Sequence, residues 1–455
     1  MTLARRIVRS LAELARGDLP APVMAAGRLH LLDAIGVGLA AAGSPVGAPY
    51  RAFASNLREA GVASLLGGGG GASAASAALV NGGLVHSLEY DDTHTGSIVH
   101  PSAVLMPAAL AVAEQVGASS HRMLGAYVLG YELLVRIGRA APGGFQAQAF
   151  QVTSVAGTLA AAIIAAELYG LGEDSTVAAL GIALSQSSGV FEFLSNGSTV
   201  KSLHPGWAAH GGVIAAQLAQ AGMTGPETAI EGKRGLFQAF TRDPDAAARF
   251  AVESDDIGYV WHVLDAAFKF SPCCHYLHPF VEAAGLLVAR GVRPEAIAEI
   301  VCEVPLGADA VICEPWADKL AAPTGHSGRW SLPIVVAARI VEGRVDLATF
   351  EQPASAAVRA LAQRISWQPL AGANFPSRFE AVVTCVTRDG ARHQVRIDDA
   401  YGNRSRPPAV EEVLGKFRVN AALSLSPDAV ADLEAALMSD DMARVSAALR
   451  GNRRM

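Results

Sequence analysis

The chain has 455 residues, of which 51% are hydrophobic and 17% charged, and its formal net charge at pH 7 is −6. This length exceeds what one compact core holds, so two domains are expected, with a large core and a buried subunit interface. The acidic balance, the lack of a basic run and an aromatic content of 6% argue against a nucleic-acid partner.

Cysteine usage and the N-terminus indicate where the protein resides. The five cysteines are few and odd in number, at positions 273, 274, 302, 313 and 385, which is typical of a reducing compartment. Residues 1–9 lack the apolar run of a secretory signal. The longest apolar stretches, residues 103–113 and 155–166, are Ala-rich and too short to span a bilayer. We therefore expect a soluble cytoplasmic protein with no membrane partner.

The first 265 residues are predicted to be overwhelmingly helical. Apolar residues repeat at helical spacing from Leu3 to Leu14, and the segment from Pro22 to Ala42 is apolar nearly all round before Gly43. Alanine lets helices approach closely, so a tightly packed bundle is expected. Further Ala-rich helices are predicted at about 102–117, 121–139, 152–169, 175–188 and 207–222.

The pattern changes near residue 268. Residues 297–304 alternate between apolar and polar, and residues 379–387 and 393–397 flank Asp389-Gly390, a strong hairpin pattern. Helices are expected at 332–342 and 354–365, and helical periodicity resumes after Pro408. We therefore predict a large helical domain from residues 1–267, an α+β domain from 268–405, and C-terminal helices from 406–455 that return to the first domain.

Glycine-rich motifs do not indicate a nucleotide site. Residues 67–71 are five consecutive glycines, but no Lys-Ser or Lys-Thr follows them, so a flexible connection is preferred to a phosphate loop. No Gly-x-Gly-x-x-Gly follows a predicted strand either.

A polar cluster from His86 to His100 interrupts two apolar, Ala-rich segments. If residues 76–93 are helical, His86, Glu89 and Thr93 lie on one face of that helix. Polar groups at the end of a buried helix are well placed to line a pocket.

A second cluster precedes the Ala-rich helix at 207–222. Lys201 lies close to the N-terminus of that helix, whose partial positive charge would add to its own and attract a carboxylate. A solvated surface lysine is the alternative, which spacing alone slightly favours.

A third cluster runs from Lys269 to His278 at the predicted domain boundary, where clefts are common. Its Cys-Cys-His-x-x-His string is similar to a metal-ligand pattern, but adjacent cysteines suit tetrahedral chelation poorly, so a polar hinge is preferred. A cysteine nucleophile activated by Lys269 and His275 is a further alternative. Lysine and histidine together suit proton transfer beside a carboxylate, because they also stabilise the enolate-like charge that develops.

Taken together, the three clusters resemble the MmgE/PrpD family, which includes 2-methylcitrate dehydratase, cis-aconitate decarboxylase and iminodisuccinate epimerase. The matching stretches cover nearly the whole chain in order: residues 78–82, 86–94, 100–102, 197–206, 231–235, 269–278, 329–333 and 416–417. The resemblance implies a mostly α fold, with a large all-helical domain and an inserted smaller α+β lid domain. It also implies a homodimer, a site between the domains, and catalysis on small di- or tricarboxylates without metal or organic cofactor.

The resemblance also carries site residues over to this chain. The catalytic set that it implies is Glu89, Thr93, His100, Lys201 and Lys269. We expect His100 to transfer the proton, the two lysines to bind carboxylate and stabilise the enolate, and Glu89 and Thr93 to orient the substrate or His100.

A second set is expected to bind substrate, namely Gln151, His204, Cys274 and His275. Two of these depart from the family pattern: Gln151 stands where the lyases carry a pocket histidine, and Cys274 where decarboxylase-like members carry another. Glutamine forms hydrogen bonds but carries no proton, which weighs against decarboxylation of cis-aconitate and dehydration of 2-methylcitrate specifically.

The sequence therefore predicts a cofactor-independent lyase that acts on a small polycarboxylate by proton transfer alpha to a carboxylate. An epimerase or isomerase of a small dicarboxylate is the second hypothesis. A non-catalytic carboxylate-binding paralogue is the third, permitted by Gln151 and Cys274 but disfavoured by the retained lysines and His100.

Overall fold

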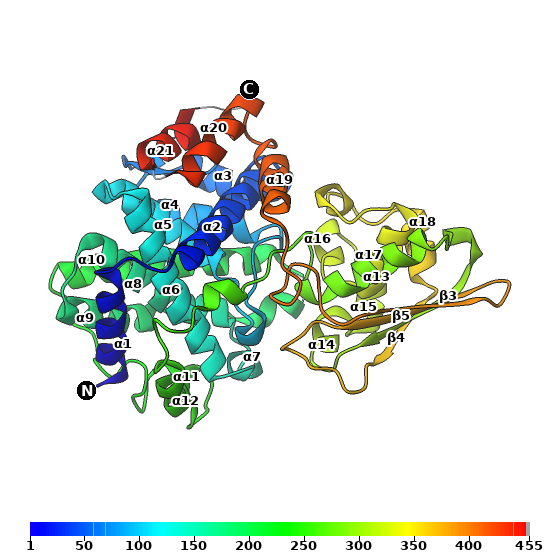
Figure 1. Ribbon diagram of the computed structural model, residues 1–455, viewed down its shortest axis with the longest axis horizontal. Coiled ribbons are helices and arrows are strands. Elements are labelled where there is room, and N and C mark those ends of the chain that lie inside the picture. The colour runs from blue at the N-terminus through cyan, green and yellow to red at the C-terminus, as the bar shows by residue number, and fades with distance from the viewer. Residues whose placement is uncertain (58, 69, 196, 440, 452–455) are drawn as a thin grey trace. The chain divides into compact units, whose positions relative to one another are not determined.

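The computed structural model describes residues 1–57, 59–68, 70–195, 197–439 and 441–451 and shows a mostly helical chain (Figure 1). The mostly α fold class predicted from the sequence is confirmed. Contacts divide the chain into two compact units, each described by itself. Unit 1 comprises Met1–Ser87, Asp91–Ala266 and Ala409–Met455, and unit 2 comprises Leu88–Tyr90 and Ala267–Pro408.

Unit 1 is a helical bundle that follows the apolar periodicity of the sequence. Its α-helices are α1 (Leu3–Ala15), α2 (Ala21–Ala42), α3 (Ala48–Ser55), α4 (Ala74–His86), α5 (Ser102–Val116), α6 (Ser120–Ala140), α7 (Gly144–Ala147), α8 (Val152–Tyr169), α9 (Glu173–Gln186), α10 (Leu203–Gln220), α11 (Leu236–Phe240), α12 (Ala246–Glu253), α19 (Val410–Ala421), α20 (Pro427–Met438) and α21 (Met442–Gly451). Short 3-10 helices are η1 (Pro45–Gly47), η2 (Thr95–Ser97), η3 (Phe191–Ser195), η4 (Thr199–Ser202) and η5 (His262–Asp265).

The centre of unit 1 is the packing of α10 against α4, α8 and α9. Small residues make this packing close: a Cβ added at Gly82 of α4 would lie 2.7 Å from the Cα of Gly206 in α10. A Cβ at Gly206 would in turn collide with the carbonyl oxygen of Leu79. The crossing therefore requires glycine on both helices, and it brings the end of α4 near the start of α10.

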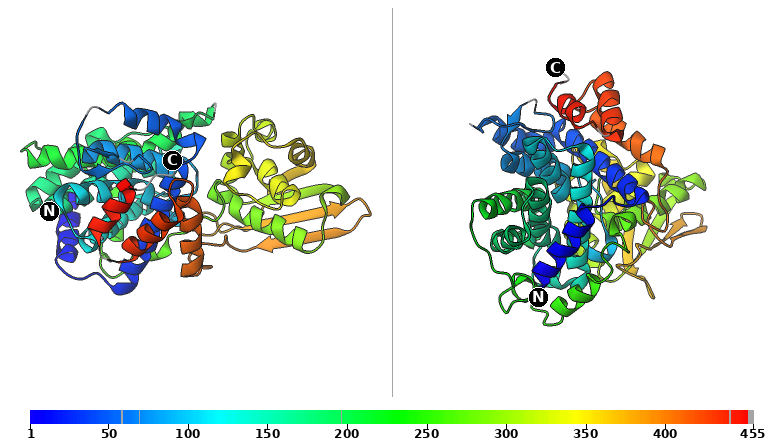
Figure 2. Two further views of the ribbon diagram at one scale, coloured as in Figure 1. Left: turned by 90° about the horizontal axis from the view of Figure 1, so that it is seen from above. Right: turned by 60° about the vertical axis from the view of Figure 1, so that its left-hand side comes forward.

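The C-terminal helices of unit 1 pack on its N-terminal ones. Figure 2 shows the orange and red C-terminal helices beside the blue N-terminal segment, and α19 and α20 both contact α2. A buried ion pair joins these elements, with Lys416 Nζ 2.9 Å from Asp33 Oδ2. Removing one partner would leave a buried charge uncompensated, which is strongly destabilising.

Within the described residues, two helices, α2 and α8, are long and apolar enough to cross a membrane by length and composition. However, 78% and 89% of their most apolar windows are buried inside the fold. Such burial is typical of core helices, as expected for residues 22–42 and 155–166, although α8 is longer than the apolar stretch that the sequence suggested was too short to span a bilayer.

Helix α4 ends at His86, so the helix considered for residues 76–93 is wrong in its second half. The chain turns sharply because Glu89 has a φ of 54°, a left-handed conformation that a helix does not contain. His86, Glu89 and Thr93 consequently do not share a helical face.

The glycine run lies beside two short paired strands, β1 (Ala63–Ser64) and β2 (Gly71–Ala72). Gly67 has a φ of 66°, which favours glycine in this turn. Residue 69, part of the predicted flexible connection, lies outside the described residues.

Unit 2 is an α+β unit around a four-stranded sheet in the order β4-β3-β5-β6. Its strands are β3 (Ile297–Val304), β4 (Ile365–Pro369), β5 (Ala381–Thr387) and β6 (Arg392–Ile397). The β5–β6 hairpin at Asp389-Gly390 is confirmed, with Gly390 at a φ of 87°. Strand β4, parallel to β3, begins at Ile365, the last residue of the segment predicted to be helical, whereas α18 ends at Ala362.

Helices pack around this sheet and give unit 2 its own apolar core. They are α13 (His278–Ala289), α14 (Asp309–Ile312), α15 (Trp316–Ala321), α16 (Gly325–Gly328), α17 (Leu332–Val341) and α18 (Ala356–Ala362), with 3-10 helices η6 (His275–Leu277), η7 (Pro294–Ala296) and η8 (Leu347–Phe350). Helix α13 contacts β5, β6 and α17.

Gly206→Ala is expected to lower the free energy of unfolding by about 1–3 kcal/mol, because the added methyl group overpacks the crossing of α4 and α10. Gly125→Ala is the matched control: nothing lies within 4 Å of an added Cβ at this position in the second turn of α6, and alanine there should be neutral or stabilising. Urea unfolding midpoints measure both. Equal midpoints would contradict the close crossing.

Candidate functional site

A buried carboxylate, Asp91, lies at the centre of a histidine cluster in unit 1. Its Oδ2 atom is 2.9 Å from Nδ1 of His86 and 3.3 Å from Nδ1 of His100. The two imidazole rings meet edge to face, with centroids 4.7 Å apart. Asp91 and His86 are fully buried, whereas the side chain of His100 is 15% exposed. His100 is therefore the member of this cluster that a dissolved molecule can reach.

The cluster continues through Gln151 to His204. Nδ1 of His204 donates to Oε1 of Gln151 at 2.6 Å, and Nε2 of Gln151 donates to Nε2 of His86 at 3.4 Å. Because His86 Nε2 accepts, its Nδ1 carries the proton that it donates to Asp91. Every donor along this chain of hydrogen bonds then meets an acceptor.

The electrostatics of the cluster follow from burial and these neighbours. Burial by itself raises the pKa of Asp91, but the His86 and His100 rings outweigh it and hold that pKa well below its usual range. Burial, followed by the neighbouring His86 and Lys201, lowers the pKa of His204 to about 4. At neutral pH the cluster thus contains an ionised Asp91 and a neutral His204.

Four segments of unit 1 position these side chains. His86 is the last residue of α4, His100 precedes α5, Gln151 is the N-cap residue of α8, and His204 lies in the first turn of α10. The backbone N–H of His100 donates to Thr153 Oγ1 at 3.0 Å, which fixes the loop to α8. The glycine crossing of α4 and α10 supplies the close approach that the cluster requires.

The other predicted residues of unit 1 lie on the same segments. Lys201 is buried in η4, immediately before α10, so it lies just outside the helix terminus that was expected to assist it. Thr93 is 4% exposed, and its hydroxyl makes no hydrogen bond within the described part of the chain. A buried hydroxyl without a partner is uncommon and is consistent with a ligand-facing role.

In unit 2 the structure joins Lys269 to the Glu89 loop. Lys269 is fully buried, and its Nζ atom donates to the backbone oxygen of Glu89 at 3.2 Å. Arg329 donates to the backbone oxygens of Leu88 and Pro272 and so ties the same two segments together. Burial lowers the pKa of Arg329 to about 10, opposed by the nearby Glu89. The guanidinium group still carries its charge at neutral pH.

Cys274 and His275 contact other residues of unit 2. The backbone N–H of Cys274 donates to the oxygen of Arg329 at 2.9 Å. The His275 ring packs edge to face against His278 and Phe379, with centroids 4.8 Å away in each case. Burial raises the pKa of the adjacent Cys273 thiol. That shift disfavours Cys273 as a nucleophile, a role that the sequence allowed for a cysteine of this cluster without saying which one.

One member of the cluster, Asp91, was not predicted from the sequence, and neither was the role of His86 beside it. His86 was singled out for a helical face, but no spacing rule pairs it with Asp91, which follows the end of α4. The donor atoms of His86, Asp91 and His100 lie within 4.8 Å of one another, a distance that also suits a metal ion. The Nδ1 proton that His86 directs at Asp91 argues for a hydrogen-bonded dyad instead.

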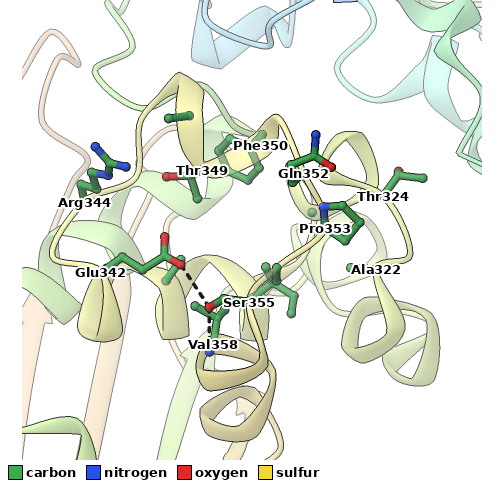
Figure 3. A pocket seen from close by; sticks show the side chains of 16 residues that line it. Ala322, Thr324, Glu342, Arg344, Thr349, Phe350, Gln352, Pro353, Ser355 and Val358 are labelled. Atoms are coloured by element: carbon green, nitrogen blue, oxygen red, sulfur yellow. Dashed lines mark hydrogen bonds between the residues drawn. The ribbon is translucent and has the colours of Figure 1, made fainter.

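A separate cavity of about 530 Å³ lies in unit 2. Figure 3 shows Glu342, Arg344, Phe350 and Ser355 around it, with a hydrogen bond of 3.2 Å between Ser355 Oγ and Glu342 Oε1. None of the nine predicted site residues lines this cavity. It offers no histidine for acid–base work, so we do not assign the chemistry to it.

Acidification is expected to destabilise unit 1 through His204. Its folded pKa of about 4 lies below the ordinary value of about 6.5. Between these pH values the unfolded chain therefore binds more protons, and the free energy of unfolding decreases as the pH is lowered. Protonation of this ring in the unfolded chain should lower the free energy of unfolding by about 2 kcal/mol between pH 7 and pH 5. Urea midpoints of wild type and His204→Gln at both pH values measure it, with the exposed His121→Gln as control. An unchanged pH dependence in His204→Gln would contradict the assignment.

Two domain descriptions match this chain along most of its length. Residues 5–249 match the MmgE/PrpD N-terminal domain, and residues 271–441 match the MmgE/PrpD C-terminal domain.

Curated relatives give a consistent picture. A cis-aconitate decarboxylase-like protein, oryM, of Aspergillus oryzae is 28% identical over 75% of this chain and 74% of its own length. Human cis-aconitate decarboxylase is 29% identical over 78% of this chain and 74% of its own length. Cis-aconitate decarboxylase of Aspergillus terreus is 27% identical over 61% of this chain and 59% of its own length.

Proposed function

Because the chain belongs to the MmgE/PrpD family, we propose that it is a lyase that acts on a small di- or tricarboxylate by proton transfer at a carbon alpha to a carboxylate. The observation that carries the proposal is the partly exposed His100 held 3.3 Å from the buried Asp91. The decarboxylase names of the relatives support a lyase-type activity.

In this proposal His100 moves the proton. A proton on Nδ1, facing Asp91, leaves the lone pair on Nε2 to act as the base. The ionised Asp91 stabilises the imidazolium ring that forms when that base takes a proton from carbon. Asp91 is then a positioning residue, and His86 holds the carboxylate from the other side.

The proposal assigns carboxylate binding to Lys201 and Lys269, as predicted from the sequence. An ammonium group is a compact charge that binds a carboxylate and stabilises an enolate. Glu89 and Thr93 orient the substrate or His100, and Gln151, His204, Cys274 and His275 contribute to binding. We further propose that the protein is a cytoplasmic homodimer.

Isomerisation or epimerisation of a small dicarboxylate is the second candidate, and Gln151 favours it. Both ends of this amide are engaged, with His204 and with His86, and an amide carries no proton. The site therefore has one acid–base group fewer than a lyase with histidine at this position.

Proton NMR in D2O tests the proposal with a panel of citrate, 2-methylcitrate, cis-aconitate and iminodisuccinate. Deuterium entering an alpha carbon, or a new olefinic signal, is expected with wild type and should be lost in His100→Ala. A new olefinic product or loss of carbon dioxide identifies a lyase, whereas exchange or epimerisation without either identifies the second candidate. If a panel member raises the thermal unfolding midpoint of the folded protein but no compound exchanges deuterium, the protein would instead be a binding paralogue.

A further inference from the structure

A second histidine–carboxylate group lies in unit 1, formed by His94, His262 and Asp265. One donor atom from each residue lies within 4.8 Å of the other two. Nδ1 of His262 is 3.9 Å from Oδ2 of Asp265, and the His94 and His262 rings meet edge to face at 5.6 Å. Nothing in the proposed proton transfer uses these side chains.

The hydrogen bonds of His94 leave one ring nitrogen suited to bind a cation. Nδ1 of His94 lies 2.8 Å from Oγ of Ser97, which itself donates to the His94 backbone oxygen. In the tautomer that carries its proton on Nδ1, the ring donates to the Ser97 hydroxyl and Nε2 carries a lone pair.

His262 is a buried ring with unmet bonding capacity. Its side chain is 4% exposed, and within the described residues neither ring nitrogen makes a hydrogen bond. Such a group in a buried position calls for an explanation, because each lost hydrogen bond there costs about 1–3 kcal/mol. A cation held by a ring nitrogen of His262 would supply the missing interaction.

The surrounding charges permit a cation. The Asp265 side chain is 19% exposed, which supplies both negative charge and access from solvent. Arg139 lies nearby, but its guanidinium group is paired with Glu253 at 2.7 and 3.2 Å. The carboxylate of Glu132 accepts hydrogen bonds from the backbone N–H groups of His262 and Val263.

The scaffold holds these donors in place. The bonds from His262 and Val263 to Glu132 fix η5 against α6. On the other side, a Cβ added at Gly138 of α6 would lie 2.7 Å from Ser97 Cβ, so the loop after His94 packs tightly on the same helix. One helix, α6, thus positions both histidines, so little conformational freedom is lost when the two rings bind one cation.

We propose that His94, His262 and Asp265 form a binding site for a divalent transition-metal cation, with Zn²⁺ as the best match. Two imidazole nitrogens and one carboxylate oxygen are a usual zinc donor set, which leaves a fourth position for water. Ser97 orients the His94 ring in the way that second-sphere partners orient metal-binding histidines. The cation would fasten the loop at His94 to η5, although the sequence predicted no metal.

Metal titration of the chelator-stripped protein tests the proposal. Wild type should bind one equivalent of Zn²⁺, and Co²⁺ should give the visible spectrum of a site with nitrogen and oxygen ligands. The midpoint of thermal unfolding should rise by roughly 3 °C at zinc concentrations near 100 times Kd. His262→Ala should lose this equivalent, and Asp265→Asn, which perturbs the core less, should weaken binding at least about tenfold.

Two controls separate this site from others. His100→Ala should still bind one equivalent of Zn²⁺, because the proposed zinc site uses no donor of the Asp91 cluster. His121→Ala, which removes an exposed histidine, should also still bind it. Circular dichroism establishes that each variant is folded. Failure of wild type to bind at roughly millimolar zinc, loss of the equivalent in His100→Ala, or its retention in folded His262→Ala and Asp265→Asn would each overturn the proposal.

Discussion

Replacing His100 with alanine should lower kcat by about 10³-fold or more, because it removes the proposed acid–base group. The fold should persist, since the bond from the His100 backbone N–H to Thr153 does not involve the side chain. Steady-state turnover of the substrate found in D2O, together with the circular dichroism spectrum, measures both effects.

The exposed histidine of α6 provides the matched control for that experiment. His121→Ala makes the same chemical change on the surface of unit 1 and should leave kcat unchanged. Full activity in a folded His100→Ala protein would refute the assignment of proton transfer to this residue.

Asp91→Asn should lower kcat by about 10³–10⁴-fold, the order seen when a buried carboxylate that orients a catalytic imidazole is changed to an amide. The carboxylate oxygen lies near two imidazole Nδ1 atoms, at 2.9 and 3.3 Å, whereas an amide offers one oxygen acceptor and an NH₂ group. One ring would lose its partner, and the positive charge that forms on His100 would lose its counter-charge. The acidic limb of the pH–rate profile should shift, because the apparent pKa of the catalytic imidazole falls without Asp91.

The neighbouring carboxylate separates positioning from stability. Asp92 is also buried and accepts from the Ser102 hydroxyl at 2.6 Å and the Tyr131 hydroxyl at 2.9 Å. Asp92→Asn should therefore reduce stability while the folded protein keeps its kcat and pH profile. Equal losses of kcat in Asp91→Asn and Asp92→Asn, with unshifted profiles, would show that Asp91 is merely structural.

Local patterns in the sequence were sufficient to predict most elements. The helix expected at 152–169 is α8, and the alternating residues 297–304 are β3, because side-chain periodicity reports directly which face is buried. Asp389-Gly390 marks the β5–β6 hairpin, because a tight hairpin turn needs a residue with positive φ and glycine adopts it readily. The polar clusters, and the family that they resemble together, were also visible without coordinates.

Errors arose where distant parts of the chain decide the local structure. Helix α10 starts at Leu203 rather than near 207, since its first turn packs through Gly206 on α4. Ile365, the last residue of the helix predicted for 354–365, begins β4 instead, because it pairs in parallel with Ile300. The roles of the nine predicted site residues stay predictions.

The sequence by itself determined the mostly helical fold class, the positions of the main helices and hairpin, and the three polar clusters, because each depends on residues close together in the chain. The tertiary structure alone decided which polar groups meet. Asp91 joins His86 and His100 only because α4 stops at His86, and Gln151 bridges His86 and His204 only because α4, α8 and α10 pack together. His94 faces His262 for the same reason, since both segments pack on α6. Helix packing, set by long-range fit of small residues, has no counterpart in local periodicity.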